Sequence, residues 1–165
     1  MNVATVLKHK GSGVVTTTSD KSLLEIAKLL AQHGIGCIVI VGEKDKIAGI
    51  VSERDLMRAI SQGGPKVLNK PVSDFMTKNV VTARKADTSE RLMSEMTVHR
   101  FRHMPVVETG RLIGLISIGD LVKIQIADME MEATATREYT GLGGLSKTLR
   151  NLYNETIVRT STSHA

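Results

Sequence analysis

The alternation of apolar and polar residues along the chain predicts one series of elements that occurs twice. In the first half, apolar residues recur at helical spacing between a Ser-x-x-Glu capping box at Ser22 and a terminating Gly34. Two short apolar runs follow, separated by a polar turn, which is typical of a β-hairpin. The elements expected here are a strand at 14–16, a helix at 23–33, strands at 35–41 and 47–51, and a helix from 52 to about 62.

The second half repeats this order. Thr88 suits the N-cap of its first helix, but Arg91 stands where a capping box needs an acid. The last helix is expected to start at Ser117 and to continue toward Tyr139, because apolar residues recur along it at helical spacing. The elements expected here are a strand at 80–82, a helix at 88–99, strands at 103–107 and 112–116, and this last helix.

The segments outside the repeat give weaker patterns. A short apolar turn is expected at 3–7, followed by a loop at 8–13, and a single helical turn is expected at 71–77. A weak amphipathic helix at 145–158 and a disordered tail at 160–165 complete the chain. We therefore divide the chain into a first unit at 3–64, a bridge at 65–79, a second unit at 80–132, and a C-terminal helical extension and tail at 133–165.

The repeat is clearest in two motifs, residues 49–56 and 114–121. Each reads Gly, two aliphatic residues, Ser, two variable residues, Asp and Leu. Upstream pairs such as His33 and His99 are 66 positions apart, whereas the motifs are 65 apart, so one residue is missing from the second hairpin loop. A unit of roughly 45 residues buries a core poorly alone. We expect an α+β fold in which two β-α-β-β-α units pack sheet to sheet with pseudo-two-fold symmetry and enclose two clefts.

Composition narrows the classes of function. A net charge of +5 and a pI near 9.5 permit an anionic ligand. Aromatic residues make up only 2% of the chain, so stacking platforms for single-stranded nucleic acid are missing and no nucleic-acid partner is expected. No apolar run is long enough for a membrane span, so no membrane partner is expected either. The single cysteine, Cys37, fits a reducing compartment, and we expect a cytoplasmic protein.

The Ser-x-x-Asp of each motif has two interpretations. Ser52 with Asp55, and Ser117 with Asp120, are spaced as helix caps with an acid near the positive end of the helix dipole. A helix N-terminus also offers free backbone N–H groups to a ligand, and a hydroxyl with a carboxylate there can bind the two hydroxyls of a ribose. A single copy favours capping, and the repetition favours a pair of binding sites.

In this register the chain resembles tandem cystathionine-β-synthase (CBS) domains, the Bateman module, and in particular small stand-alone bacterial members. The resemblance covers residues 3–130 and rests on both Gly-to-Asp motifs, on His-Met-Pro-Val-Val at 103–107, on Val-Ser-Asp-Phe-Met-Thr at 72–77, and on the repeat spacing. It implies a non-enzymatic regulatory module that binds AMP, ADP, ATP or NADH, needs no catalytic cofactor, and signals energy or redox state to a protein that the sequence does not identify. It also implies a homodimer that pairs through helical faces.

The resemblance further implies two clefts that each mix both units. Cleft A takes Thr18, Ile35 and Cys37 from the first unit with Leu115, Ser117, Gly119 and Asp120 from the second. Cleft B takes Arg84, Phe101 and His103 from the second unit with Ile50, Ser52, Arg54 and Asp55 from the first. Phosphates are expected near Arg100, Arg102 and His103.

The two clefts are not expected to be equal. Arg100 and Arg102 stand where the first unit has Gly34 and Gly36, and Val39 replaces the proline usual in the family. The arginines could equally be a solvated edge at a helix C-terminus.

Two other functions compete with nucleotide binding. One is an adaptor that binds a protein without any nucleotide. The other, an enzyme or a nucleic-acid binder, is disfavoured because no nucleophile–base pair accompanies the repeat. His99 and His103 are four residues apart, but a helix–strand boundary separates them, so they do not form a zinc pair on one helix face.

Overall fold

The computed structural model describes residues 1–11 and 13–139 of the chain. The helix expected at 145–158 and the tail expected at 160–165 lie outside the described residues. The chain divides into two compact units, Met1–Val122 and Lys123–Ala165. Both repeated halves, apart from the greater part of the last helix, belong to the first of these units.

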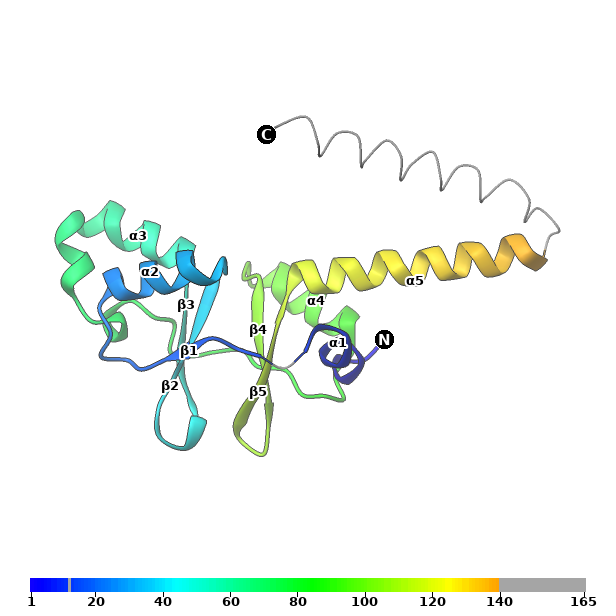
Figure 1. The fold of residues 1–165 in the computed structure, drawn as a ribbon, viewed down its shortest axis with the longest axis horizontal. Coiled ribbons are helices and arrows are strands. Elements are labelled where there is room, and N and C mark those ends of the chain that lie inside the picture. The colour runs from blue at the N-terminus through cyan, green and yellow to red at the C-terminus, as the bar shows by residue number, and fades with distance from the viewer. Residues whose placement is uncertain (12, 140–165) are drawn as a thin grey trace. The chain divides into compact units, whose positions relative to one another are not determined.

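The first half forms a three-stranded sheet (Figure 1). Strand β1 (Thr16–Thr17) runs parallel to β2 (Cys37–Val41), which runs antiparallel to β3 (Ile47–Ser52). Helices α2 (Leu23–His33) and α3 (Glu53–Gly63) follow β1 and β3. The capping box predicted for α2 is confirmed, because Ser22 N–H donates to Glu25 Oε2 at 2.9 Å and Glu25 N–H donates to Ser22 Oγ at 3.3 Å.

The second half contains α4 (Ser89–Val98), the antiparallel hairpin of β4 (His103–Glu108) and β5 (Arg111–Ser117), and the beginning of α5 (Ile118–Tyr139). The continuation of α5 to Tyr139 confirms the predicted last helix. Thr88 caps α4 by accepting the N–H of Arg91 at 3.2 Å, without a capping box, as predicted.

The strand predicted at 80–82 is wrong. Only an isolated parallel bridge forms, between Ala83 and Val106. Ala83 N–H donates to Pro105 O, and Val107 N–H donates to Ala83 O. The next ladder bond would need a backbone N–H on Pro105, which proline lacks. Val39 stands at the equivalent place in the first half, and β1 forms there. The difference between Val39 and Pro105 therefore explains why the first half has a third strand and the second does not.

The pairing registers of the two halves coincide. Cys37 pairs with Ser52 as His103 pairs with Ser117, and a register shift follows Ile40 as it follows Val106. The halves differ in the hairpin loop, where the first has a 3-10 turn η1 (Glu43–Asp45) and the second has a tight turn at 109–110. The missing residue thus lies where the sequence predicted it.

Each half packs against a leader, by which we mean the short segment that precedes the other half in the sequence. The leaders are residues 1–10 and 70–77. The first leader contains α1 (Val3–Lys10) and joins the second half, because Val3 N–H donates to Asp87 O at 2.9 Å. The second contains η3 (Val72–Asp74) and joins the first half, because Val72 N–H donates to Lys21 O at 2.7 Å. A further 3-10 turn, η2 (Pro65–Asn69), connects α3 to this second leader.

The loop predicted at 8–13 is wrong in its start, since α1 continues to Lys10. Asn2 caps this helix by accepting the N–H of Thr5 at 3.0 Å, and three basic residues in its last turn suit the negative end of the helix dipole. Val3 and Val6 on α1 are fully buried, and so is Val72 on the other leader. The leaders are therefore part of the core.

The glycine that opens each motif allows a leader to approach. A Cβ at Gly114 would lie 2.6 Å from Cδ2 of Leu7, and one at Gly49 would lie 2.6 Å from Sδ of Met76 and 2.9 Å from the carbonyl oxygen of Thr77. These distances are shorter than van der Waals contact. Within residues 1–11 and 13–139, no helix is both long and apolar enough to cross a membrane.

Candidate functional site

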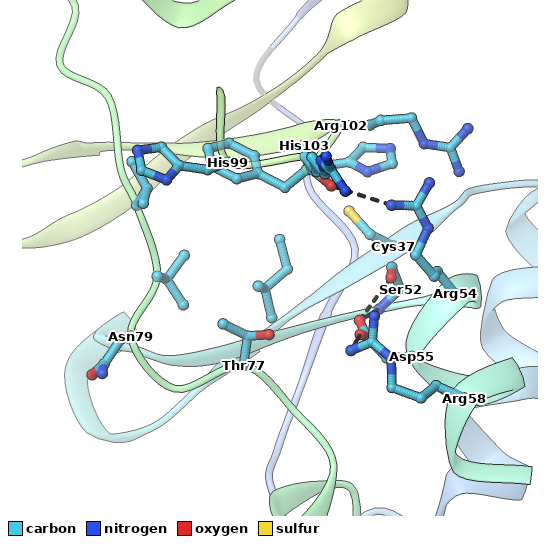
Figure 2. A pocket seen from close by; sticks show the side chains of 15 residues that line it. Cys37, Ser52, Arg54, Asp55, Arg58, Thr77, Asn79, His99, Arg102 and His103 are labelled. Carbon is cyan, nitrogen blue, oxygen red and sulfur yellow. Dashed lines mark hydrogen bonds and ion pairs between the residues drawn. The ribbon is translucent and has the colours of Figure 1, made fainter. Parts of the chain in front are cut away.

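A pocket of about 250 Å³ takes its walls from both halves of the first compact unit (Figure 2). The first half contributes the end of β3 and the start of α3, the second contributes the turn between α4 and β4, and residues 77–81, where the bridge enters the second half, line the pocket as well. Of the residues predicted for cleft B, these line the pocket: Ile50, Ser52, Arg54, Asp55, Phe101, Arg102 and His103. Arg84 is not among the lining residues.

Asp55 holds the start of α3 with only one of its oxygens. Its Oδ2 accepts the backbone N–H of Ser52 at 2.9 Å and the Ser52 hydroxyl at 2.7 Å. Its Oδ1 lies 3.7 Å from the guanidinium of Arg58, whose side chain is 61% exposed, so this ion pair is weak. The capping and binding interpretations are therefore compatible, because Oδ2 caps the helix and Oδ1 is left for the hydroxyl of a ligand.

Four arginines line the pocket against one carboxylate. Figure 2 shows Arg54, Arg58 and Arg102 on the side where Ser52 and Asp55 lie. Arg54 Nη1 donates to the carbonyl oxygen of Arg100 at 3.2 Å, which ties the start of α3 to the turn before β4. Guanidinium groups bind phosphate oxygens in bidentate fashion, so this side of the pocket suits a phosphate chain.

Arg100 adopts a left-handed backbone with φ of 56°. Its counterpart in the first half, Gly34, has φ of 60° and ends α2. The left-handed region is easy for glycine but costs other L-residues roughly 1–2 kcal/mol. The second half thus bears backbone strain at a residue whose side chain lines the pocket.

The opposite side of the pocket is less charged. Figure 2 shows Thr77 and Asn79 away from Arg54 and Arg58, and Val80, Val81 and Phe101 also line the pocket. The ring of Phe101 stacks on that of His99, with centroids 6.3 Å apart and planes 8° apart. Flat apolar surface with an amide beside it suits a purine base.

Two titratable groups that line the pocket, His103 and Cys37, have shifted pKa values. Burial lowers the pKa of His103, and the positive charges of Arg102 and Lys10 lower it further. Burial raises the pKa of Cys37 to about 12, so its thiol is a poor nucleophile at neutral pH. Among the described residues, no cluster of three or more His, Cys, Asp or Glu side chains could hold a metal ion.

Cleft A differs because a lysine occupies its polar groups. Asp120 Oδ2 accepts the N–H and the hydroxyl of Ser117 at 2.8 and 2.7 Å, as in the other half. It also accepts Lys10 Nζ at 2.5 Å, and the same ammonium donates to the carbonyl oxygen of Leu115 at 2.9 Å. Burial alone would raise the pKa of Asp120, but the hydrogen bonds from Lys10 and Ser117 hold it below its usual value.

Thr18, Ile35 and Cys37, also predicted for cleft A, have different surroundings. Cys37 lines the pocket described above, and Ile35 packs against the core of the first half. Thr18 is exposed and hydrogen-bonds Asp20. Its counterpart Arg84 is also exposed, in a turn where its N–H donates to Asp87 Oδ2 at 2.7 Å.

Sequence reasoning missed several residues that line these sites. They are Lys10 at cleft A, and Arg58, Thr77, Asn79 and His99 at the pocket. The i, i+3 spacing of Arg58 from Asp55 was an available signal for Arg58, whereas nothing near Lys10 in the sequence indicated its contact with Asp120.

Comparison with known proteins identifies relatives of the whole repeat. The sequence profile of the CBS domain matches residues 11–62 and again residues 72–127. A mitochondrial CBS domain-containing protein of Arabidopsis thaliana is 32% identical over 83% of this chain and 70% of its own length. The chain spans 66% of the length of two further relatives, from Methanopyrus kandleri and Acidianus ambivalens.

Solved structures share the fold. A CBS-domain containing protein from Agrobacterium tumefaciens is 45% identical, with a TM-score of 0.74 over 76% of this chain and 99% of that one. A CBS domain pair solved with 5′-methylthioadenosine and S-adenosyl-L-methionine is 26% identical, with a TM-score of 0.69 over 78% and 98%. A CBS domain protein from Pyrobaculum aerophilum complexed with AMP is 26% identical, with a TM-score of 0.65 over 73% and 89%.

Proposed function

The chain belongs to the CBS domain family, and from this premise we propose that it is a non-enzymatic regulatory module whose pocket binds an adenine nucleotide. The observation that carries the proposal is the pairing of Ser52 and Asp55 with four arginines in one pocket. Two similar structures contain adenosine compounds, which supports an adenosyl ligand. In this assignment Asp55 Oδ1 receives a ribose hydroxyl, and the purine lies against Val80, Val81 and Phe101.

The charge of the pocket favours a ligand with more than one phosphate. Arg54, Arg58, Arg100 and Arg102 outnumber the single carboxylate of Asp55. A sulfonium compound such as S-adenosyl-L-methionine would add a positive charge beside these guanidiniums, which costs free energy. We therefore expect affinity to rise from AMP to ADP and ATP, with NADH as a further candidate, and S-adenosyl-L-methionine to bind more weakly than AMP.

Regulation follows from the position of the pocket. Ser52 and Asp55 come from the first half, whereas Phe101 and Arg102 come from the second. A ligand that touches both halves stabilises the arrangement that brings them together, and a partner protein that distinguishes this arrangement from a more open one is thereby regulated. The proposed partner is a protein, and the signal is the cellular level of the nucleotide.

The proposed oligomer is a homodimer through helical faces. Met57 on α3 and Val98 on α4 are 66% and 69% exposed. On α5, Ile126, Met129 and Met131 are each more than half exposed. Apolar side chains this exposed favour an interface between copies of the chain. Sedimentation of the full chain at micromolar concentration tests this, and a monomer would reject the homodimer.

Isothermal titration calorimetry tests the proposed ligand. We expect ADP and ATP to bind the wild-type chain, and Asp55→Asn to weaken them at least tenfold, because an amide accepts a ribose hydroxyl less strongly than a carboxylate does. The matched control is Asp120→Asn, which changes the equivalent residue of cleft A and is expected to leave pocket affinity unchanged. Absence of heat and of thermal stabilisation with millimolar nucleotide would reject the function and leave the protein-interaction adaptor.

A further inference from the structure

Lys10 neutralises the carboxylate that cleft A would offer to a ligand. Its ammonium donates to Asp120 Oδ2 at 2.5 Å and to the carbonyl oxygen of Leu115 at 2.9 Å. The contact is partly shielded from water, since the side chains of Lys10 and Asp120 are 33% and 19% exposed. A charge-assisted bond of this kind is stronger than a bond between a carboxylate and a neutral hydroxyl.

The position of Lys10 follows from a difference between the two leaders. Both begin with a buried valine, Val3 or Val72, that bonds to the turn before the first helix of the other half. The first leader remains helical as far as Lys10, whereas the second leaves its helical turn after Asp74. The additional helical turn places Lys10 beside the motif at 114–121, where its side chain reaches Leu115 and Asp120.

The pocket around Asp55 contains no equivalent lysine among its lining residues. The residue 69 positions after Lys10, which is the offset between Val3 and Val72, is Asn79, a neutral residue that lines the pocket. Glycine stands at positions 34, 36 and 119, and the equivalent positions in the repeat, 100, 102 and 54, are arginines. The two sites therefore differ in their charges, with arginines around the carboxylate of one and a lysine paired with the carboxylate of the other.

We propose that Lys10 closes cleft A, so that each chain binds one nucleotide, in the pocket around Asp55, and removal of Lys10 opens a second site. This inference rests on the proposed function. A ribose that binds at Asp120 must compete with the ammonium of Lys10 for the carboxylate, and glycines stand in the repeat where arginines line the other site. Lys10 is thus a residue that determines stoichiometry, and the two pseudo-symmetric motifs perform different tasks.

The test is calorimetric titration of ADP into the full chain and into Lys10→Met, which keeps the length of the side chain and removes its charge. We expect one ADP per chain for wild type and two for Lys10→Met, with affinity at the second site raised at least roughly tenfold. Lys8→Met removes one positive charge from the exposed surface of the same helix and should keep one ADP per chain. Lys10→Arg retains the charge and should also keep one.

The double variant Lys10→Met/Asp120→Asn locates the new site, because it should return the stoichiometry to one. Circular dichroism and the unfolding midpoint establish that each variant is folded. Two ADP per wild-type chain, or one ADP per folded Lys10→Met chain, would overturn the role of Lys10. If wild type binds none and Lys10→Met binds one, Lys10 closes cleft A and the proposed pocket is wrong; if neither binds, both proposals fail.

Discussion

The backbone of Arg100 shows how single residues make the two halves unequal. Gly34 and Arg100 occupy the same place in the repeat and the same left-handed conformation, yet only glycine adopts it without strain. The pocket gains a guanidinium at this place, and the fold bears the cost. At Pro105 and Val39 the substitution changes hydrogen bonding instead, because proline ends the strand ladder of the second half.

Replacement of Arg100 by glycine should raise the stability of the fold and lower its affinity for ADP. Arg100→Gly removes the left-handed strain but increases the entropy of the unfolded chain, so we expect a net stabilisation of about 0.5–1 kcal/mol. Affinity for ADP should fall about tenfold, because one guanidinium leaves the phosphate side of the pocket. Arg100→Ala is the matched control: it retains the strain and should lose affinity without gaining stability. Urea unfolding and calorimetry measure the two effects, and a destabilised Arg100→Gly would refute the argument from strain.

His103 should make stability depend on pH. Burial, with the charges of Arg102 and Lys10, lowers its pKa below the usual 6.5, so the folded chain binds fewer protons than the unfolded chain once the pH falls below about 6.5. The free energy of unfolding must then decrease as the pH falls through that range, until the pKa of the folded state is passed. His103 is partly exposed, so the loss per pH unit is less than about 1.4 kcal/mol.

Urea unfolding at pH 7.5 and pH 5.5 measures this loss. We expect His103→Gln to lose less stability between these values than wild type does. His33→Gln, which replaces an exposed histidine, controls for the removal of a titratable group. An equal loss in His103→Gln and wild type would show that other groups set the dependence on pH.

At the scale of elements, the packing of a leader against each motif explains why Gly49 and Gly114 open the two motifs. Gly114 faces the flexible end of Leu7, whereas Gly49 faces both Met76 and the backbone carbonyl of Thr77. Thr77 is held in place by reciprocal backbone bonds with Ile50, at 2.9 and 3.0 Å. The two glycines are equivalent in sequence but differ in how far their neighbours can move.

We predict that alanine at Gly49 and alanine at Gly114 lower the free energy of unfolding by different amounts. Gly49→Ala should destabilise the fold by roughly 1–3 kcal/mol, because the carbonyl of Thr77 cannot move without breaking the bonds to Ile50. Gly114→Ala should cost less, since the side chain of Leu7 can rotate away. Gly13→Ala, where no atom lies within 4 Å of an added Cβ, is the control and should be nearly neutral. Equal losses at Gly49 and Gly114 in urea unfolding would contradict this account.

Local patterns in the sequence predicted most elements, and contacts between distant segments explain the misses. Ser22 with Glu25 located α2 and the apolar runs located both hairpins, since caps and periodicity act within a few residues. The missing strand at 80–82 depends on an N–H that Pro105 lacks, more than 20 positions away. Lys10 reaches Asp120 from 110 positions away, so the basic run at 8–10 gave no indication of its role.

At the scale of the whole molecule, the repeat gives two related sites that the leaders make different. The pocket around Asp55 combines arginines, a carboxylate oxygen and an apolar wall, whereas the other carboxylate is bonded to Lys10. The proposed regulation requires a site that touches both halves, and the lining of the pocket around Asp55 meets this requirement. The exchange of leaders also ties the halves into one folding unit, so neither half is expected to fold alone.

The most direct test of the account is a crystal structure of the full chain with ADP. We predict ligand density in the pocket lined by residues of both halves, with a ribose hydroxyl on Asp55, the phosphates on the guanidiniums of Arg100 and Arg102, and Lys10 still bonded to Asp120. Density at Asp120 in place of Lys10, or a pocket without ligand in crystals grown with millimolar ADP, would contradict the central claim.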